Sequence, residues 1–222
     1  MNYYSEKDIR DIVAGVIAQY GRSCAGEAEK DEPPIPVEMS ARHVHLTREA
    51  LDILFGKGYR LTPKKDLSQK GQFLSEEQVK LVTRKGELAR VSVLGPVRNY
   101  VQVELSATDA RALGIKPPVR LSGELEGAED VLLMGPAGIY EARSSTIIAR
   151  AHVHMTPEQA EKYRVHNGQQ LSVRMETERP LTLDGIIVRV SDDAGLAVHI
   201  DVDEANAAMV KPDTVGTIVK RG

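Results

Sequence analysis

Several features that often indicate function are scarce in this sequence of 222 residues. It has no tryptophan, and its aromatic content of 4% argues against a platform on which nucleic-acid bases stack. Its single cysteine, Cys24, cannot form an internal disulfide, which favours a reducing compartment. A net charge of −3 gives no excess of positive charge for a nucleic acid or an anionic membrane. We therefore expect no nucleic acid and no membrane as a partner.

Long apolar runs are absent as well. No stretch of about 18 apolar residues is present that would form a membrane span. The first residues lack a basic start followed by an apolar run, so no secretory signal is predicted. The hydrophobic content of 41% and the charged content of 27% are typical of a soluble globular protein.

The first 36 residues are predicted to form a helix and a linker. Residues 5–20 carry apolar residues at helical spacing on one face, and Gly21 provides a stop. Residues 21–36 are polar, charged and proline-bearing, which is typical of a flexible linker. A short amphipathic helix buries too little area to fold alone. The segment 1–20 either docks on its own globule or acts as a targeting helix for a partner groove or shell.

From residue 37 onward, the sequence predicts many short strands and a few brief helices. Four helix starts are marked by capping residues, at Thr47, at Ser106 or Thr108, at Thr156 and at Asp201. Many short strands with brief helices indicate small β-barrels or sandwiches. We predict a mainly β protein with short helices, in which two similar small β-barrels pack together.

One short pattern occurs twice. Its first copy, at 41–47, reads ARHVHLT, and its second copy, at 149–156, reads ARAHVHMT. In each copy, two histidines separated by one residue lie on a predicted strand, so that both imidazoles point to one face. Such a pair on a half-exposed strand is often only an alternation of polar residues. Its recurrence favours two halves of a zinc site, and a duplicated chain that builds one metal centre.

Two other predicted strands carry residues that could complete this centre. In the sequence LAVHID, His199 faces away from the apolar residues and is a candidate for a third imidazole. In the sequence VQVEL, Glu104 faces away from the apolar residues and could ligate a metal. Arg98, just before this strand, could clamp an anion with two hydrogen bonds. Alternatively, Arg98 and Glu104 form an ordinary surface ion pair.

Taken together, these segments resemble the PduL-type phosphate acyltransferases (phosphate propanoyltransferases). The matching segments occur in the expected order across residues 37–220. They are SARHVHL at 40–46, GPVR at 95–98 with QVE at 102–104, HVH at 152–154, HID at 199–201 and DEANA at 203–207. The second copy of the repeat departs from the first, because Ala151 separates Arg150 from His152 and leaves Arg42 without a direct counterpart.

The resemblance implies an acyltransferase with two Zn²⁺ per chain. One zinc would be held by His43, His45 and Glu104, and the other by His152, His154 and His199. Glu104 would be shared between them. Arg98 would bind phosphate, and we consider Arg42 and Arg111 as contacts for the phosphates of coenzyme A (CoA).

The resemblance also implies an exchange of strands between two domains. The strand predicted at 37–46 would join residues 155–222 in one barrel, and residues 47–154 would form the other. The reaction would convert a short acyl-CoA, propanoyl-CoA or acetyl-CoA, and phosphate into acyl phosphate and CoA.

The resemblance further implies a location in the lumen of a bacterial microcompartment, with the cytoplasm as the alternative. Shell or cargo proteins would bind the N-terminal helix, and we expect a homodimer. Two other functions use the same ligands, namely a dinuclear zinc hydrolase of phosphoesters or thioesters and a non-catalytic zinc-binding structural module.

Overall fold

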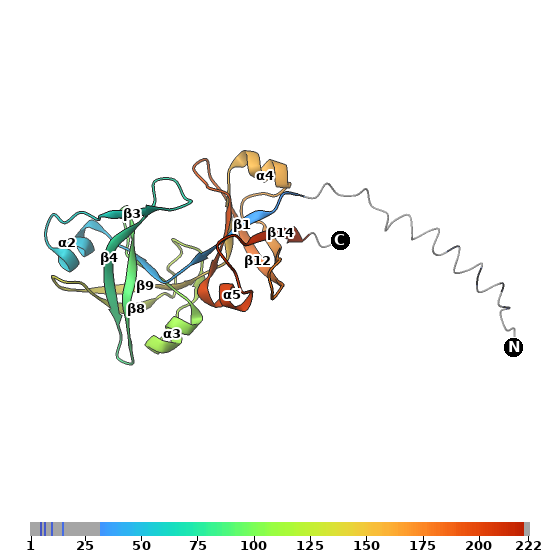
Figure 1. Cartoon of the computed structure of the whole chain (residues 1–222). Coiled ribbons are helices and arrows are strands. Elements are labelled where there is room, and N and C mark those ends of the chain that lie inside the picture. The colour runs from blue at the N-terminus through green and yellow to red at the C-terminus, as the bar shows by residue number, and fades with distance from the viewer. Residues whose placement is uncertain (1–4, 6, 8–9, 11–14, 16–31, 220–222) are drawn as a thin grey trace. The chain divides into compact units, whose positions relative to one another are not determined.

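The computed structural model describes residues 32–219 and four isolated positions before them, Ser5, Lys7, Arg10 and Gly15. The helix predicted over 1–20 and the linker predicted over 21–36 therefore lie mostly outside the described residues. The last two residues of the predicted linker belong instead to the first strand. The chain divides into two units, residues 1–33 and 34–222, and the barrels lie in the second (Figure 1).

Six strands from the two ends of the second unit close into one barrel, here called the terminal barrel. They are β1 (Ile35–Ser40), β10 (His152–Met155), β11 (Gln170–Met175), β12 (Leu181–Val190), β13 (Ala197–Asp201) and β14 (Val215–Val219). Their order around the ring is β1-β13-β10-β12-β11-β14. The first strand of the chain thus closes a barrel whose other strands come from the C-terminal part, which is the exchange that the resemblance implies.

The residues in between form a second closed ring, here called the central barrel. Its strands are β2 (His43–His45), β4 (Phe73–Val82), β5 (Glu87–Gly95), β6 (Gln102–Leu105), β8 (Glu129–Met134) and β9 (Ile139–Ala149). They pair in the order β4-β5-β2-β6-β9-β8, and β8 returns to β4. Two short strands extend this sheet, β3 (Pro63–Asp66) beside β4 and β7 (Val119–Arg120) beside β9.

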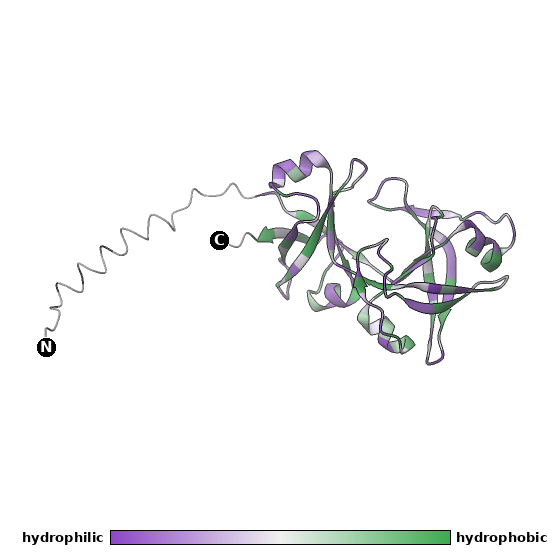
Figure 2. Cartoon of the chain, turned by 180° about the vertical axis from the view of Figure 1, so that it is seen from behind, coloured by the Kyte–Doolittle hydropathy of each residue, from purple (hydrophilic) through white to green (hydrophobic). Residues whose placement is uncertain are grey.

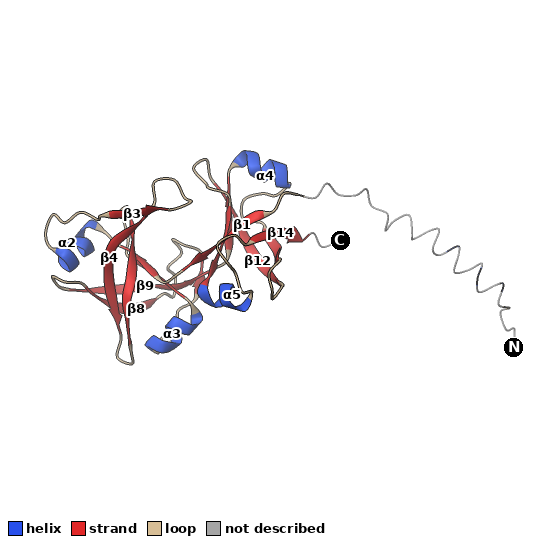
Figure 3. Ribbon diagram, viewed as in Figure 1, coloured by secondary structure: helices blue, strands red, loops and turns tan. Residues whose placement is uncertain are grey.

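Four short helices connect these strands (Figure 3). They are α2 (Arg48–Phe55), α3 (Ala107–Leu113), α4 (Pro157–Tyr163) and α5 (Val202–Ala207). Each begins after a predicted capping residue, whose side-chain oxygen accepts a backbone N–H: Thr47, Ser106, Thr156 and Asp201. The predicted fold class is therefore confirmed. Within the described part of the chain, every helix is too short or too polar to cross a membrane.

Each barrel has its own apolar core. The largest fully buried side chains of the terminal barrel are Ile35, Met155, Met175, Ile186 and Ile200. Those of the central barrel and its helix α2 include Leu46, Leu51, Leu54, Leu81 and Leu133. Hydrophobic and hydrophilic residues alternate along the strands, so one face of each strand can face the core (Figure 2). Burial of one such side chain contributes about 1.5–3 kcal/mol.

The two barrels repeat one topology. In the central barrel β2 is parallel to β5 and antiparallel to β6, and in the terminal barrel β10 is parallel to β12 and antiparallel to β13. The strand β6 is in turn parallel to β9, as β13 is to β1. The strand β1 therefore occupies in the terminal barrel the place of β9 in the central barrel. The chain enters each histidine strand directly from a strand of the other barrel, β2 from β1 and β10 from β9.

This topology corrects the boundaries predicted from the sequence. The strand predicted over 37–46 is two strands, which separate at residues 41–42, and β2 belongs to the central barrel. Likewise, a break at residues 150–151 separates β9 from β10, and β10 belongs to the terminal barrel. The alternation of polar and apolar residues continues through the second break, so periodicity alone does not reveal that the chain changes barrel there. At the first break the alternation shifts by one residue, because the polar residues Arg42 and His43 are adjacent.

Candidate active site

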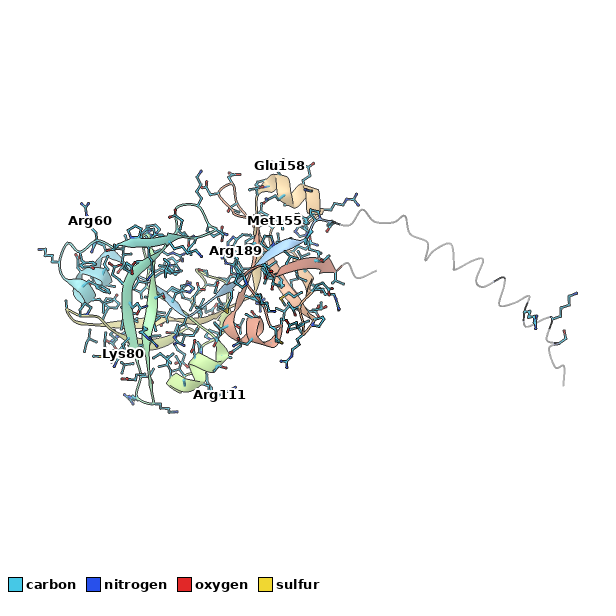
Figure 4. The ribbon with its side chains drawn as sticks, in the orientation of Figure 1. Arg60, Lys80, Arg111, Met155, Glu158 and Arg189 are labelled. Carbon is cyan, nitrogen blue, oxygen red and sulfur yellow. The ribbon has the colours of Figure 1, made fainter. Side chains whose placement is uncertain are left out.

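A pocket of about 560 Å³ is lined by side chains of both barrels. The terminal barrel contributes Glu38, His152, His154, Arg189 and His199, and the central barrel His43, His45, Leu94, Arg98, Glu104 and Ser122, with Arg42 from the connection between them. All the predicted site residues except Arg111 therefore line one pocket. Arg111 is exposed on α3, outside the pocket lining, whereas Arg189 lies between the two barrels (Figure 4).

The first cluster of possible metal ligands is His43, His45 and Glu104, all buried. His43 and Glu104 are register partners on the antiparallel strands β2 and β6, and the Nε2 atom of His43 lies 3.4 Å from Oε2 of Glu104. The Nδ1 atom of His45 is buried and has no hydrogen-bond partner among the described residues. A buried ring nitrogen without a partner is costly unless a ligand satisfies it.

The second cluster is His152, His154 and His199. His152 is the register partner of His199 on β13, and its Nε2 atom lies 3.1 Å from Nε2 of His154. The three ring centroids are 4.8 to 5.2 Å apart. Three imidazoles at this spacing, with ring nitrogens turned toward one another, match the donor set of a zinc site.

The first histidine of each pair is oriented in the same way. The Nδ1 atom of His43 lies 2.8 Å from the carbonyl oxygen of Ala41, and that of His152 lies 2.8 Å from the carbonyl oxygen of Arg150. Each Nδ1–H donates to a carbonyl two residues earlier, at the break between two strands. This hydrogen bond fixes the tautomer with the proton on Nδ1, so that Nε2 carries a free lone pair, as is usual for histidines that bind metals. The strand breaks, where the chain passes from one barrel to the other, therefore also provide the carbonyl groups that orient the ligands.

Their surroundings keep two imidazoles of the second cluster, His152 and His154, neutral. Burial is the main cause that lowers the pKa of His152 to about 4, and burial followed by the charges of its histidine neighbours lowers that of His154 to about 3. Both imidazoles are thus unprotonated at neutral pH and available as ligands.

In the first cluster, burial opposes charge on both partners, but the attraction between His43 and Glu104 outweighs it. That attraction raises the pKa of His43 and lowers that of Glu104.

The shared topology identifies equivalent positions in the two barrels. Glu104 pairs with the first histidine of β2, and His199 pairs with the first histidine of β10. The third member of each cluster thus comes from the same position, as a carboxylate in the central barrel and an imidazole in the terminal barrel. The second histidine of each pair has Leu94 beside it in one barrel and Arg189 in the other. The duplicated scaffold therefore presents two chemically different walls.

Arg98 reaches the pocket from the connection between β5 and β6. Its guanidinium makes two long hydrogen bonds to neutral groups, 3.3 Å to Oγ of Ser122 and 3.4 Å to Oε1 of Gln72. Within the described residues it forms no ion pair, so the surface pair with Glu104 that the sequence also allowed is not present. Arg42, in contrast, is paired with Asp109 at 2.8 Å. A half-buried guanidinium bonded only to neutral groups is suited to bind an anion.

Comparison with known proteins agrees with this geometry. The profile of the family described as phosphate propanoyltransferase matches residues 36–211. The chain belongs to the phosphate propanoyltransferase family. A phosphate propanoyltransferase of Alkaliphilus metalliredigens is 42% identical over 215 residues, which cover 97% of this chain and 99% of the relative. One from Thermotoga maritima is 47% identical over 192 residues, 86% of this chain and 91% of the relative. As a member of this family, the chain is an acyltransferase.

In this phosphate propanoyltransferase family member, a hydrogen bond from Gln102 orients the carboxylate of Glu104. Gln102 is fully buried, and its side-chain Nε2 donates to Oε1 of Glu104 at 2.5 Å and to Oγ of Ser122 at 2.8 Å. Its Oε1 accepts the backbone N–H of Gly123 at 2.8 Å, which fixes which end of the amide faces Glu104. Gln102 therefore holds one oxygen of Glu104 and leaves the other toward His43. Through Ser122 the same network reaches Arg98.

We expect Gln102→Leu to loosen this carboxylate. The change leaves Oε1 of Glu104 and the N–H of Gly123 without partners, which costs about 1–3 kcal/mol of unfolding free energy. Loss of a residue that orients a ligand lowers metal affinity by about 10- to 100-fold. Denaturant unfolding and zinc titration of the metal-free protein would measure both effects, with the exposed Gln170→Leu as the matched control. Equal zinc affinity in the two variants would contradict the role of Gln102.

Sequence reasoning did not assign a role to several residues of the site. They are Glu38, Ser68, Gln72, Gln102, Ser122 and Arg189. Only Gln102 carries a usable signal, because it shares a strand face with Glu104. Ser68 and Gln72 lie in the connection after β3, and Ser68 donates to Glu38 at 2.7 Å, whose carboxylate lies 3.3 Å from Nε2 of His199. Contacts of this kind depend on how the two barrels meet.

Proposed function

We propose that the chain transfers a short acyl group reversibly between CoA and inorganic phosphate at a centre of two zinc ions. The observation that carries the proposal is the single pocket in which both ligand clusters and the unpaired Arg98 meet. The phosphate propanoyltransferase family supports acyl transfer to phosphate. The donor sets support metal, because they consist of five imidazoles and one carboxylate.

The residues of the pocket hold the reactants in place. Phosphate is a weak nucleophile that shares its negative charge with CoA, so it must be bound and oriented before it attacks. Arg98 would grip it with two N–H groups, and Ser122 and Gln72 keep the guanidinium in position. An oxygen of the phosphate attacks the thioester carbonyl, the C–O bond forms, and the C–S bond breaks as CoA leaves as a thiolate.

The six ligands would hold zinc in two sets, one formed by His43, His45 and Glu104 and the other by the three histidines of the terminal barrel. When bound, zinc supplies a Lewis acid for the carbonyl oxygen and stabilises a thiolate. Glu104 would be shared between the sets. The proposed reaction needs no acyl-enzyme intermediate, because phosphate attacks the thioester directly.

One experiment tests the function directly. Acyl-CoA esters of increasing chain length are supplied with and without phosphate, on protein of measured metal content, and the release of CoA and the product are followed. We expect release only with phosphate, an acyl phosphate as product, and the fastest turnover with acetyl- or propanoyl-CoA. Release of free acid without phosphate would indicate a hydrolase instead. The absence of any turnover on metal-loaded protein would contradict acyl transfer.

The setting of the enzyme stays a prediction. Residues 1–20 would direct it to the lumen of a bacterial microcompartment by binding shell or cargo proteins, and the enzyme would act as a homodimer. Contacts of Arg42 and Arg111 with the phosphates of CoA are proposed on the same terms.

A further inference from the structure

Arg189 is a cationic residue of the pocket that belongs to neither ligand cluster. It lies on β12, where its register partner is His154 on the neighbouring strand β10. Its side chain is half-buried and lines the pocket with the three histidines of the terminal barrel. In the central barrel, Leu94 occupies the equivalent position beside His45. The terminal barrel therefore presents a positive charge where its counterpart presents an apolar surface.

Among the residues that the structure describes, no group neutralises the charge of Arg189. Across residues 32–219, its side chain makes no hydrogen bond and no ion pair. The acidic group on the same wall is Glu38, and its carboxylate is already engaged by Ser68 at 2.7 Å and by His199 at 3.3 Å. His152 and His154, on the same wall, are neutral imidazoles. Burial comes first among the causes that lower the pKa of His154, and the charge of Arg189 adds to it.

An unpaired guanidinium inside a pocket is costly unless the pocket receives an anion. Arginine presents a planar fork of N–H donors that matches the oxygens of a phosphate group. Both proposed substrates carry phosphate groups, and two anions in a pocket of about 560 Å³ repel each other unless cations lie beside both. Arg98 provides a cation on the wall of the central barrel only.

We propose that Arg189 binds a phosphate group on the wall of the terminal barrel, as a second anion-binding residue beside Arg98. The inference rests on the proposed function, because that function brings phosphate groups into the pocket. The group bound is either the phosphate that is transferred or one of the phosphates of CoA. In both cases Arg189 recognises the substrate and takes no part in breaking the thioester.

Direct binding tests this without relying on turnover. Inorganic phosphate and CoA are titrated separately into the metal-loaded protein by calorimetry, for wild type, Arg189→Gln and Arg189→Lys. We expect Arg189→Gln to lower the affinity for one of the two ligands by at least about tenfold, as is typical for the loss of a charge-assisted hydrogen bond. Arg189→Lys should recover part of that affinity. The exposed Arg60→Gln, far from Arg189 in Figure 4, is the matched control.

The outcomes separate the two sources of phosphate. Weaker binding of inorganic phosphate assigns Arg189 to the transferred group, and weaker binding of CoA with unchanged phosphate affinity assigns it to CoA. Unchanged affinity for both ligands would overturn the proposal, as would a wild type that binds neither. If wild type binds both ligands but transfers no acyl group, the proposed function fails while the binding role of Arg189 is still decided.

Discussion

His152→Ala is expected to remove one of the two proposed zinc ions and to abolish turnover. His152 is one of three histidines whose ring centroids lie 4.8 to 5.2 Å apart, and its Nε2 is 3.1 Å from that of His154. Its tautomer is fixed by the carbonyl of Arg150. Mutation of a residue that only orients a metal ligand already lowers metal affinity or activity by about 10- to 100-fold. Loss of a ligand itself should therefore lower turnover by more than about 100-fold.

The zinc content and the rate must be measured on the same preparation. The matched control is His166→Ala, because His166 is exposed and lies outside the pocket lining. Circular dichroism would verify that the barrels remain folded. Full activity together with two zinc ions per chain in the His152→Ala protein would remove the second histidine pair from the site.

Arg98→Ala is expected to raise the KM for phosphate by about 10- to 100-fold, the range of a charge-assisted hydrogen bond. The KM for acyl-CoA should change far less, because the guanidinium, which among the described residues is bonded to Ser122 and Gln72 alone, would act on the phosphate. Arg98→Lys should recover only part of the loss, since an ammonium keeps the charge but lacks the two-pronged geometry.

Steady-state kinetics with phosphate and acyl-CoA varied in turn would separate the two effects. Arg60→Ala, a change of an exposed arginine, is the control for the loss of one positive charge. If Arg98→Ala keeps the phosphate dependence of wild type, Arg98 does not bind the phosphate.

Much of the local structure was predictable from short-range chemistry. Capping by Thr47 and Thr156 follows from hydroxyls that accept backbone N–H groups at a helix start, and the structure shows both bonds. The pairing of histidines on one strand face follows from the period of two residues. His199 and Glu104 could be selected because each faces away from the apolar residues of its strand.

The remaining features depend on contacts between distant strands. Nothing near Arg189 in the sequence indicates that β12 lies beside the second histidine pair. The hydrogen bonds of Gln102 require Ser122 and Gly123, which follow α3 in the sequence and lie in a loop that returns to Gln102. The change of barrel at residues 41–42 and 150–151 was hidden for the same reason, since strand partners are set by tertiary packing rather than by local alternation.

Strand β1 belongs to the terminal barrel although the chain forms it before the whole central barrel, and this affects the order of folding during synthesis. The strands of the central barrel are contiguous, so this barrel can close once β9 has left the ribosome. Strand β1, made before all of them, must wait for β13, because Val37 pairs with Val198. Until then it carries an unpaired edge, which is a site for wrong association. The terminal barrel, and with it the second histidine cluster, is therefore the last part of the enzyme to assemble.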